Sequence, residues 1–455
     1  MTSPRTIDVA AVLDSRKLGG FNYKLILLSW LITVFDGFDM MMISFTAPYM
    51  RDELRLDTIM LGNVFSAGIV GMMLGGFFFA YLGDRIGRRP TIIGAAFAFG
   101  LLTLATAFAS SYEQLLFLRF FDGFAIGGML PLAWALNIEY VPGRFRSTVV
   151  TLIMMGYSFG TAMAGPLTVW LAPTYGWQAV FAFGGAATLI CAVLLWLMLP
   201  ESVRFLTSKN RRPDVVAATL NRIAPELQAS GQDRFELGDE RKITSNFRVS
   251  QLFEGRLRWI TPLLWIGYTI SSLAIYFSSS WGPIVLEAME FPRNTAAYVS
   301  SIGGFLGAIA GLALMRFTDR HGPFSVAVYP ILAIPFLLML GLVPMTPDLF
   351  LPLSIVGTAL VGGAHFGILS IAGVYYPSAV RANGAGWATS IAKAGAIVGP
   401  LIGAAVLAAG VPAVRTFALL AVCPAILALS AIGIGIVVRR RPDIDFAVGN
   451  AATAS

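Results

Sequence analysis

Residues 82–90, LGDRIGRRP, return in altered form as residues 316–324, RFTDRHGPF. The stretches EYVPGRFRSTVV at 139–150 and VYYPSAVRANGA at 374–385 are a second such couple, as are AGPL at 164–167 and VGPL at 398–401. Three residue pairs share one spacing along the chain: Asp84 with Asp319, Pro142 with Pro377, and Arg146 with Arg381. Independent landmarks with one common offset indicate that the chain is a duplication.

The composition indicates a membrane protein. Of the 455 residues, 56% are hydrophobic and 13% are charged, so a soluble globule would expose most of its apolar surface. Runs of roughly 20 apolar residues, the length that crosses a hydrocarbon core of about 30 Å, recur along the chain. They predict twelve transmembrane helices at about 22–50, 58–82, 90–110, 112–139, 147–171, 176–199, 259–287, 294–316, 322–343, 348–376, 382–408 and 413–438. The short alternating segments of a barrel are not seen.

One long hydrophilic stretch divides these helices six and six. The predicted organisation is a segment 1–21, a first six-helix bundle 22–199, a central loop 200–258, a second bundle 259–438 and a tail 439–455. Within the loop, RRPDVVAATLNRIAPEL at 211–227 predicts a short amphipathic helix and carries no catalytic or recognition motif. Repeated halves of a helical membrane bundle are the architecture in which a central site opens alternately to either side.

The distribution of lysine and arginine predicts the orientation. With both termini cytoplasmic, four basic residues fall outside (Arg51, Arg55, Arg293 and Arg415), two fall within the membrane (Arg119 and Lys393), and the rest of the 32 fall inside. The net charge of +7 is therefore a topology signal and not a sign of nucleic-acid binding. The two cysteines, Cys191 and Cys423, lie in apolar helix interiors, which disfavours a disulfide or a metal site.

The first apolar run contains two acids, in FDGFDMMM at residues 35–42. Asp36 and Asp39 are three residues apart and so share one helix face. An ionisable group at bilayer depth costs a few kcal/mol, and it usually faces a cavity or a partner. Two close carboxylates disfavour simultaneous ionisation, so such a pair can hold and release a proton. The alternative is that both are capping or interface acids near the membrane surface.

The fourth apolar run carries more buried charge, in LRFFDGFAIGG at residues 118–128 and in Glu139. Arg119 and Asp122 are also three residues apart and could simply neutralise one another. Glu139 falls close to the cytoplasmic end, with Arg144 and Arg146 just beyond it. A gating ion pair and a coupling role both remain open for Glu139.

The stretch at 82–90 resembles the loop motif of the major facilitator superfamily, and the likeness covers nearly the whole chain. The matching residues are Gly83, Asp84, Arg85, Gly87, Arg88 and Arg89. PESVRFL at 200–206 resembles a second landmark of that superfamily, and Arg119 matches its helix-four arginine motif. The resemblance implies that Arg119 tunes or relays a proton, and that the loop forms a cytoplasmic latch that locks one conformation. To this latch we assign also Arg144, Arg146, Asp319, Arg320, His321 and Arg381.

Three further strings resemble one subfamily, the aromatic acid:proton symporters. They are DGFD at 36–39, DRHG at 319–322 and YPSAVRANGAGW ending at Trp387. The resemblance implies that Asp36 and Asp39 are needed for transport, and that the protein is a monomer in the inner membrane whose partners are an aromatic acid, a proton and the lipid bilayer, with no cofactor. Lys393 stands where many relatives carry arginine, and lysine lacks the bidentate fork that grips a carboxylate.

An aromatic carboxylate requires a cation, hydrogen-bond donors and flat apolar walls. We therefore assign substrate binding to Asp36, Asp39, Arg119, Lys393, His365 and Trp281, with Trp134 and Tyr157 as further wall candidates. Lys393 is the carboxylate partner that its position favours. His365 is either a donor or a packed polar residue, and each aromatic residue is either a wall or a packing residue.

The sequence thus predicts proton-coupled uptake of a benzoate-type or hydroxybenzoate-type acid by alternating access. Symport of another organic anion is one alternative, and export is another, since GTAMAGPL at 160–167 partly resembles an antiporter motif. Val169 and Trp170 stand where that motif has two glycines, which argues against export. An enzyme is disfavoured because no metal-spaced cluster or serine, histidine and acid set lies at membrane depth, and the chain has only two histidines. A non-transporting sensor is a further alternative, and it would bind its ligand without moving it across the membrane.

Overall fold

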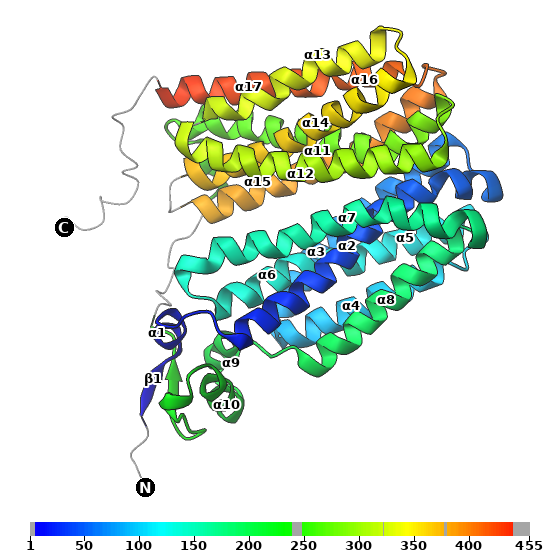
Figure 1. Ribbon diagram of the computed structural model, residues 1–455. Coiled ribbons are helices and arrows are strands. Elements are labelled where there is room, and N and C mark those ends of the chain that lie inside the picture. Colours follow the sequence, from blue (N-terminus) through cyan, green and yellow to red (C-terminus); the bar gives the residue numbers. More distant parts are fainter. Residues whose placement is uncertain (1–4, 239–247, 322, 377–379, 440–455) are drawn as a thin grey trace. The chain divides into compact units, whose positions relative to one another are not determined.

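The computed structural model describes residues 5–238, 248–321, 323–376 and 380–439 (Figure 1). Inside its helices and turns the side chains are not described at 315, 316, 319–321, 323, 370, 372–375, 381 and 382. Within these described parts, twelve helical segments are long and apolar enough to cross a membrane. The prediction of an all-helical, twelve-span chain is confirmed.

The first six spans are α2 (Gly20–Leu54), α3 (Thr58–Ile86), α4 (Arg88–Thr106), α5 (Tyr112–Ile126) with α6 (Met129–Tyr140), α7 (Arg146–Tyr175) and α8 (Trp177–Met198). The second six are α11 (Leu257–Ala288), α12 (Arg293–His321), α13 (Val328–Leu342), α14 (Pro347–Tyr375), α15 (Arg381–Ala408) and α16 (Arg415–Leu420) with α17 (Val422–Arg439). Short 3-10 turns are η1 (Gly143–Phe145), η2 (Pro225–Leu227), η3 (Val249–Phe253) and η4 (Pro323–Ala327).

Two spans differ from the continuous helices that their apolar runs predict. The fourth is interrupted at Gly127 and Gly128, where a side chain on either residue would meet α3 at Met72 or Phe79. The twelfth is interrupted at Ala421. Close approach of a neighbouring helix therefore selects glycine at the first break, which apolar length alone does not reveal.

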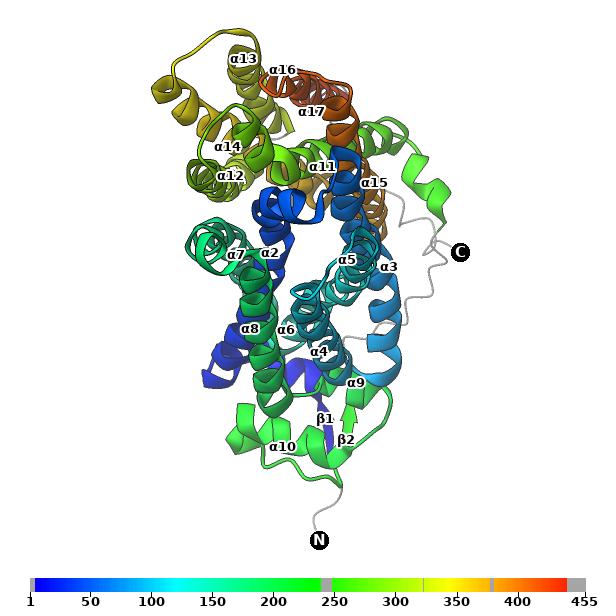
Figure 2. The ribbon, with the colours of Figure 1, turned by 90° about the vertical axis from the view of Figure 1, so that its right-hand side faces the viewer.

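The chain packs as two compact units. Unit 1 comprises Met1–Met40, Val70–Gly160 and Gln178–Ser245, and unit 2 comprises Met41–Ile69, Thr161–Trp177 and Asn246–Ser455. The units do not coincide with the six-and-six division, because the second halves of α2 and α7 and the first half of α3 pack with the later helices. In unit 2, α11 lies against α14, α15 and α17, and α12 lies along α14 (Figures 1 and 2).

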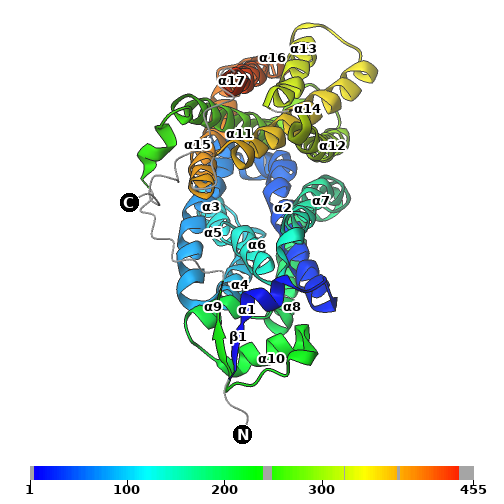
Figure 3. The same ribbon diagram turned by 90° about the vertical axis from the view of Figure 1, so that its left-hand side faces the viewer.

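A small layer of unit 1 joins the beginning of the chain to the central loop. Strand β1 (Thr6–Asp8) pairs in parallel with β2 (Arg234–Glu236), beside helices α1 (Val9–Asp14), α9 (Val203–Ser208) and α10 (Pro213–Ile223) (Figures 1 and 3). The predicted amphipathic helix is α10, which buries Val216 and Leu220 in a hydrophobic cluster and lies against α9. Strand pairing was not predicted, because three-residue strands carry no periodicity.

Hydrogen bonds fix this layer to the helices. The Asp14 carboxylate accepts from the Gly143 backbone N–H at 2.6 Å, and Arg144 donates to the carbonyl of Arg16 at 3.1 Å. The backbone N–H groups of Ser230 and Arg5 donate to Asp233 and hold the pKa of that carboxyl below its usual range. The segment before α2 is therefore tied both to the central loop and to the turn between α6 and α7.

Candidate functional site

The acids of the first helix and the charges of the fourth meet inside unit 1. Asp39 on α2 presents both oxygens to Arg119 on α5, with Oδ1 accepting from Nη1 at 3.0 Å and Oδ2 lying 3.0 Å from Nη2. The same Nη1 donates to Asp122 at 2.7 Å, and Thr103 on α4 donates to the other oxygen of Asp122 at 2.9 Å. We call Asp36, Asp39, Thr103, Arg119 and Asp122 the buried charge cluster.

Asp36 is the member of this cluster that lacks a partner. It is 2% exposed, and neither carboxylate oxygen has a hydrogen-bond partner among the described residues. Asp39, Arg119 and Asp122 are 1%, 3% and 0% exposed. The cluster can therefore hold up to three negative charges against one positive charge in a site that water does not reach, and such an imbalance is costly unless a proton is taken up.

The glycine between the two acids is explained by helix packing. A side-chain carbon on Gly37 would collide with the carbonyl of Tyr157 on α7, and one on Gly160 would collide with the carbonyl of Val34 on α2. The backbones of α2 and α7 thus touch on both sides of this level, as small residues allow in membrane helices. The sequence analysis missed Gly37, although glycine between two buried acids was the available signal.

The residues of the stretch at 82–90 form a second charged site, at the end of unit 1 where α3 meets α4. Arg88 is 2.7 Å from Asp84 and 3.2 Å from Glu139, and its guanidinium lies over the ring of Phe205. Glu201 accepts from the backbone N–H groups of Arg88 and Arg89, at the N-terminus of α4, where a carboxylate is favoured. This geometry groups Glu139 with the latch residues and not with the buried charge cluster.

The remaining latch candidates of the first half make local contacts. Arg89 donates to the carbonyls of Leu199 and Trp196 at the end of α8, and Arg85 donates to the Tyr81 hydroxyl. Gly87 has a φ of 113°, a conformation that favours glycine. Gly83 faces Leu132, Arg144 lies over the ring of Phe145, and Arg146 donates to the carbonyl of Val141.

The second copy of the latch is not described at the level of side chains. Asp319, Arg320 and His321 end α12 and Arg381 begins α15, but their side chains lie outside the described part of the structure. Their predicted roles stay predictions.

Unit 2 holds the substrate candidates of the second half. Lys393 is half-buried on α15 and has no ion pair or hydrogen bond with any described residue. His365 on α14 has its Nδ1 atom 3.1 Å from the Ser271 hydroxyl on α11. Trp281 is buried, donates to the carbonyl of Pro400 at 2.9 Å and contacts Phe65 edge to face, so its indole packs between helices in this structure.

The two further wall candidates lie in unit 1. Trp134 on α6 packs partly buried against Ile26, Val149 and Ile153. The backbone carbonyl of Tyr157 packs closely against Gly37, as described above. Their predicted role as substrate walls stays a prediction.

A group of ion pairs that the sequence analysis did not predict lies in unit 2. Arg293 on α12 contacts Glu287 on α11 at 3.0 Å and Asp52 on α2 at 2.5 Å, and Arg51 contacts Glu287 at 3.2 Å. The Arg293 guanidinium also lies 4.7 Å from the ring centre of Tyr49. We call Arg51, Asp52, Glu287 and Arg293 the ion-pair group.

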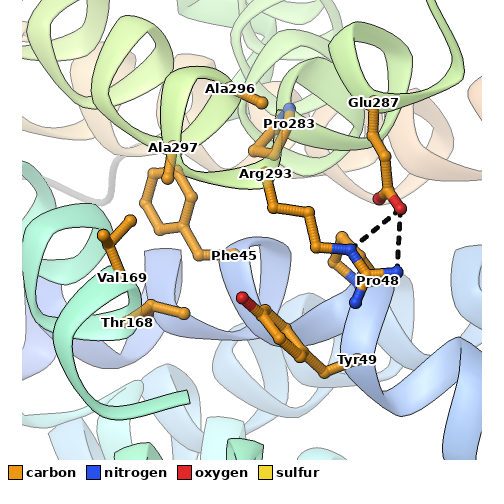
Figure 4. Close-up of a pocket in the computed structure, with 10 residues that line it drawn as sticks. All are labelled: Phe45, Pro48, Tyr49, Thr168, Val169, Pro283, Glu287, Arg293, Ala296 and Ala297. Atoms are coloured by element: carbon orange, nitrogen blue, oxygen red, sulfur yellow. Dashed lines mark hydrogen bonds and ion pairs between the residues drawn. The ribbon is translucent and has the colours of Figure 1, made fainter. Parts of the chain in front are cut away.

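Glu287 and Arg293 of this group also line a small pocket (Figure 4). Its lining residues come from α2, α7, α11 and α12, and they are Phe45, Pro48, Tyr49, Thr168, Val169, Pro283, Glu287, Arg293, Ala296 and Ala297. Apolar side chains form its interior, and Arg293 with Glu287 forms its charged edge (Figure 4). These charged residues lie at the ends of α2 and α11 and at the start of α12. They are far apart in the sequence, so no sequence motif predicts the group.

The described residues hold twelve helices long and apolar enough to cross a membrane, with charged side chains buried among them, which is the architecture of a multi-pass membrane protein. The chain belongs to the Major Facilitator Superfamily, whose family model matches residues 29–400. It is a transporter and not an enzyme.

Similar proteins give this assignment more detail. The 4-hydroxybenzoate transporter PcaK of Pseudomonas putida is 31% identical over 407 residues, covering 89% of this chain and 91% of that protein. The gallate transporter of Pseudomonas putida is 34% identical over 431 residues, covering 94% of each chain. A solved structure of the xylose transporter XylE from E. coli, in a partially occluded inward open conformation, matches with a TM-score of 0.68 at 16% identity and covers 90% of this chain and 97% of that one.

Proposed function

We propose that this protein takes up an aromatic carboxylate of the benzoate or hydroxybenzoate type together with a proton. The observation that carries the proposal is Asp36, a buried carboxyl that has no hydrogen-bond partner among the described residues and lies next to the Asp39–Arg119 ion pair. The names of the relatives, which are transporters of 4-hydroxybenzoate and gallate, support the substrate class.

The proton resides on the acid pair of α2. An ionised carboxylate that is buried and unpaired is several kcal/mol more costly than a neutral one. Protonation of the pair therefore favours a closed, dry site, whereas deprotonation favours a state in which water reaches Asp36. No cofactor is needed beyond this coupling proton.

Lys393 binds the carboxylate of the substrate. Its amine is half-buried without a counter-ion among the described residues, and so it is available to a carboxylate. Ser271 orients the His365 ring, whose second nitrogen can bond a ring hydroxyl of the substrate. Arg119, already held by two carboxylates, contributes to the overall charge balance more than to direct binding.

The protein acts as a monomer in the inner membrane with both termini cytoplasmic, so the Arg88 latch is cytoplasmic and the ion-pair group faces outward. Substrate and proton enter while the contacts of the ion-pair group are broken, and they leave while the contacts of the latch are broken. Because the proton and the aromatic acid favour the same closed state, the inward proton gradient drives uptake of the acid. Symport of another organic anion would use the same device with a different pocket.

The test is uptake of labelled 4-hydroxybenzoate by proteoliposomes, with an inward proton gradient and with that gradient collapsed. We expect accumulation only with the gradient, and its loss in Asp36→Asn and in Asp39→Asn. Asp348→Asn, which changes an exposed acid in the first turn of α14, is the matched control and should accumulate normally. Gradient-driven efflux of preloaded acid without accumulation would instead identify an exporter.

A further inference from the structure

In the buried charge cluster, Asp122 competes with Asp39 for the guanidinium of Arg119. Arg119 does not serve Asp39 exclusively, because its Nη1 atom is shared between Asp39 at 3.0 Å and Asp122 at 2.7 Å. The shorter of the two contacts belongs to Asp122, which is fully buried. One guanidinium is thus divided between two carboxylates from different helices.

Asp122 is held in this position from its other side. The Thr103 hydroxyl on α4 donates to Asp122 Oδ1, while Arg119 binds Oδ2. A hydroxyl that donates to a carboxylate favours its ionised form. Thr103 itself is buried, with 1% of its surface exposed.

Among the described residues, the charged groups that act on the cluster come from two helices. They are Asp36 and Asp39 on α2 and Arg119 and Asp122 on α5. From α4 the polar contact is Thr103, and α7 meets this level of α2 with the backbone of Tyr157. With all four groups ionised, three negative charges face one positive charge.

We propose that Asp122 is a positioning residue that sets the proton affinity of the Asp36–Asp39 pair by withholding part of Arg119 from it. An ionised Asp122 occupies Arg119, so the guanidinium neutralises the pair incompletely and a proton completes the balance. When the pair takes up its proton, Arg119 keeps Asp122 as a partner and is never left as an unpaired buried cation. This inference rests on the proposed proton coupling of the preceding section.

The test is the pH dependence of the initial uptake rate of 4-hydroxybenzoate in proteoliposomes. In Asp122→Asn, Arg119 belongs to Asp39 alone and the pair attracts protons less strongly. We expect the midpoint of the pH profile to move about one unit toward acid, since one charge at this range shifts a titration by about that much. Asp122→Glu should restore much of the wild-type midpoint.

Thr103 provides a second pair of variants in case Asp122→Asn does not reach the membrane. Thr103→Val removes the hydroxyl at nearly constant volume, which weakens the ionised form of Asp122. It should therefore shift the midpoint in the same direction by a smaller amount, whereas Thr103→Ser keeps the hydroxyl and the wild-type midpoint. A wild-type midpoint in Asp122→Asn, or in Thr103→Val if only that variant inserts, overturns the inference.

Failure of the inference differs from failure of the proposed function. If the wild-type protein does not accumulate the acid under a proton gradient, the proposed function fails. If the wild-type accumulates it, Asp39→Asn does not, and Asp122→Asn keeps both rate and midpoint, then proton coupling stands and only the role of Asp122 is wrong. A merely structural role for Asp122 would lower the rate without moving the midpoint.

Discussion

Lys393 is a half-buried amine without an ion pair among the described residues, which is an unusual state for a lysine in an apolar helix. If it binds the substrate carboxylate, Lys393→Gln removes a charge-assisted hydrogen bond worth about 1.5–3 kcal/mol. The concentration of 4-hydroxybenzoate that half-saturates uptake should then rise roughly tenfold or more. Lys393→Arg keeps the positive charge, so its half-saturating concentration should rise less than that of Lys393→Gln.

The measurement is the concentration dependence of initial uptake at fixed pH. Lys209→Gln, at an exposed lysine that follows α9, is the matched control and should leave half-saturation unchanged. A Lys393→Gln protein with wild-type half-saturation would remove Lys393 from the substrate site.

At this scale the sequence identifies the type of residue but not its partner. Asp36, Asp39 and Arg119 stand out because charge is rare in apolar runs. The contact of Thr103 with Asp122 joins two helices whose relative rotation no periodicity specifies, so a threonine among many could not be singled out. Glu139 illustrates the same limit, since only the position of Arg88 shows which charged site it joins.

Between elements, the contact of α2 with α7 sets where the acid pair lies. Gly37→Ala would place a methyl group against the carbonyl of Tyr157, so the two helices must separate. Overpacking of this kind costs typically about 1–3 kcal/mol. We expect a lower midpoint of thermal unfolding in detergent, together with slower proton-driven uptake, because Asp36 and Asp39 move with α2.

The control is Gly94→Ala on α4, where an added carbon meets nothing within 4 Å. Since alanine is a better helix former than glycine by up to about 1 kcal/mol, this variant should unfold at the wild-type temperature or slightly above it. Equal unfolding temperatures for Gly37→Ala and Gly94→Ala would show that α2 and α7 do not need their close contact.

Elements that apolar length defines are predictable, and those that pairing defines are not. The twelve spans follow from runs of about 20 apolar residues. By contrast, TID at 6–8 becomes a strand only because RFE at 234–236 lies beside it, and neither segment has a pattern of its own. The ion-pair group is similar, since Asp52 and Arg293 meet only after the helices pack.

At the scale of the whole molecule, symport is a statement about linked equilibria. If protonation of the acid pair and binding of the aromatic acid favour the same state, each must strengthen the other by the same factor. The coupling can therefore be measured by binding alone, without transport.

The final prediction concerns substrate affinity and pH. Between pH 6 and 8 the substrate carboxylate stays ionised, so any pH dependence of binding reports on the protein. For one linked proton, the dissociation constant of 4-hydroxybenzoate should fall by up to about tenfold per pH unit as the pH is lowered. In Asp36→Asn the amide imitates the protonated carboxyl, so binding should stay tight and lose its pH dependence while gradient-driven accumulation is lost. Titration calorimetry of the purified proteins at several pH values measures this. A wild-type affinity that does not change with pH, or an Asp36→Asn affinity that still does, would show that Asp36 is not the proton site linked to the substrate.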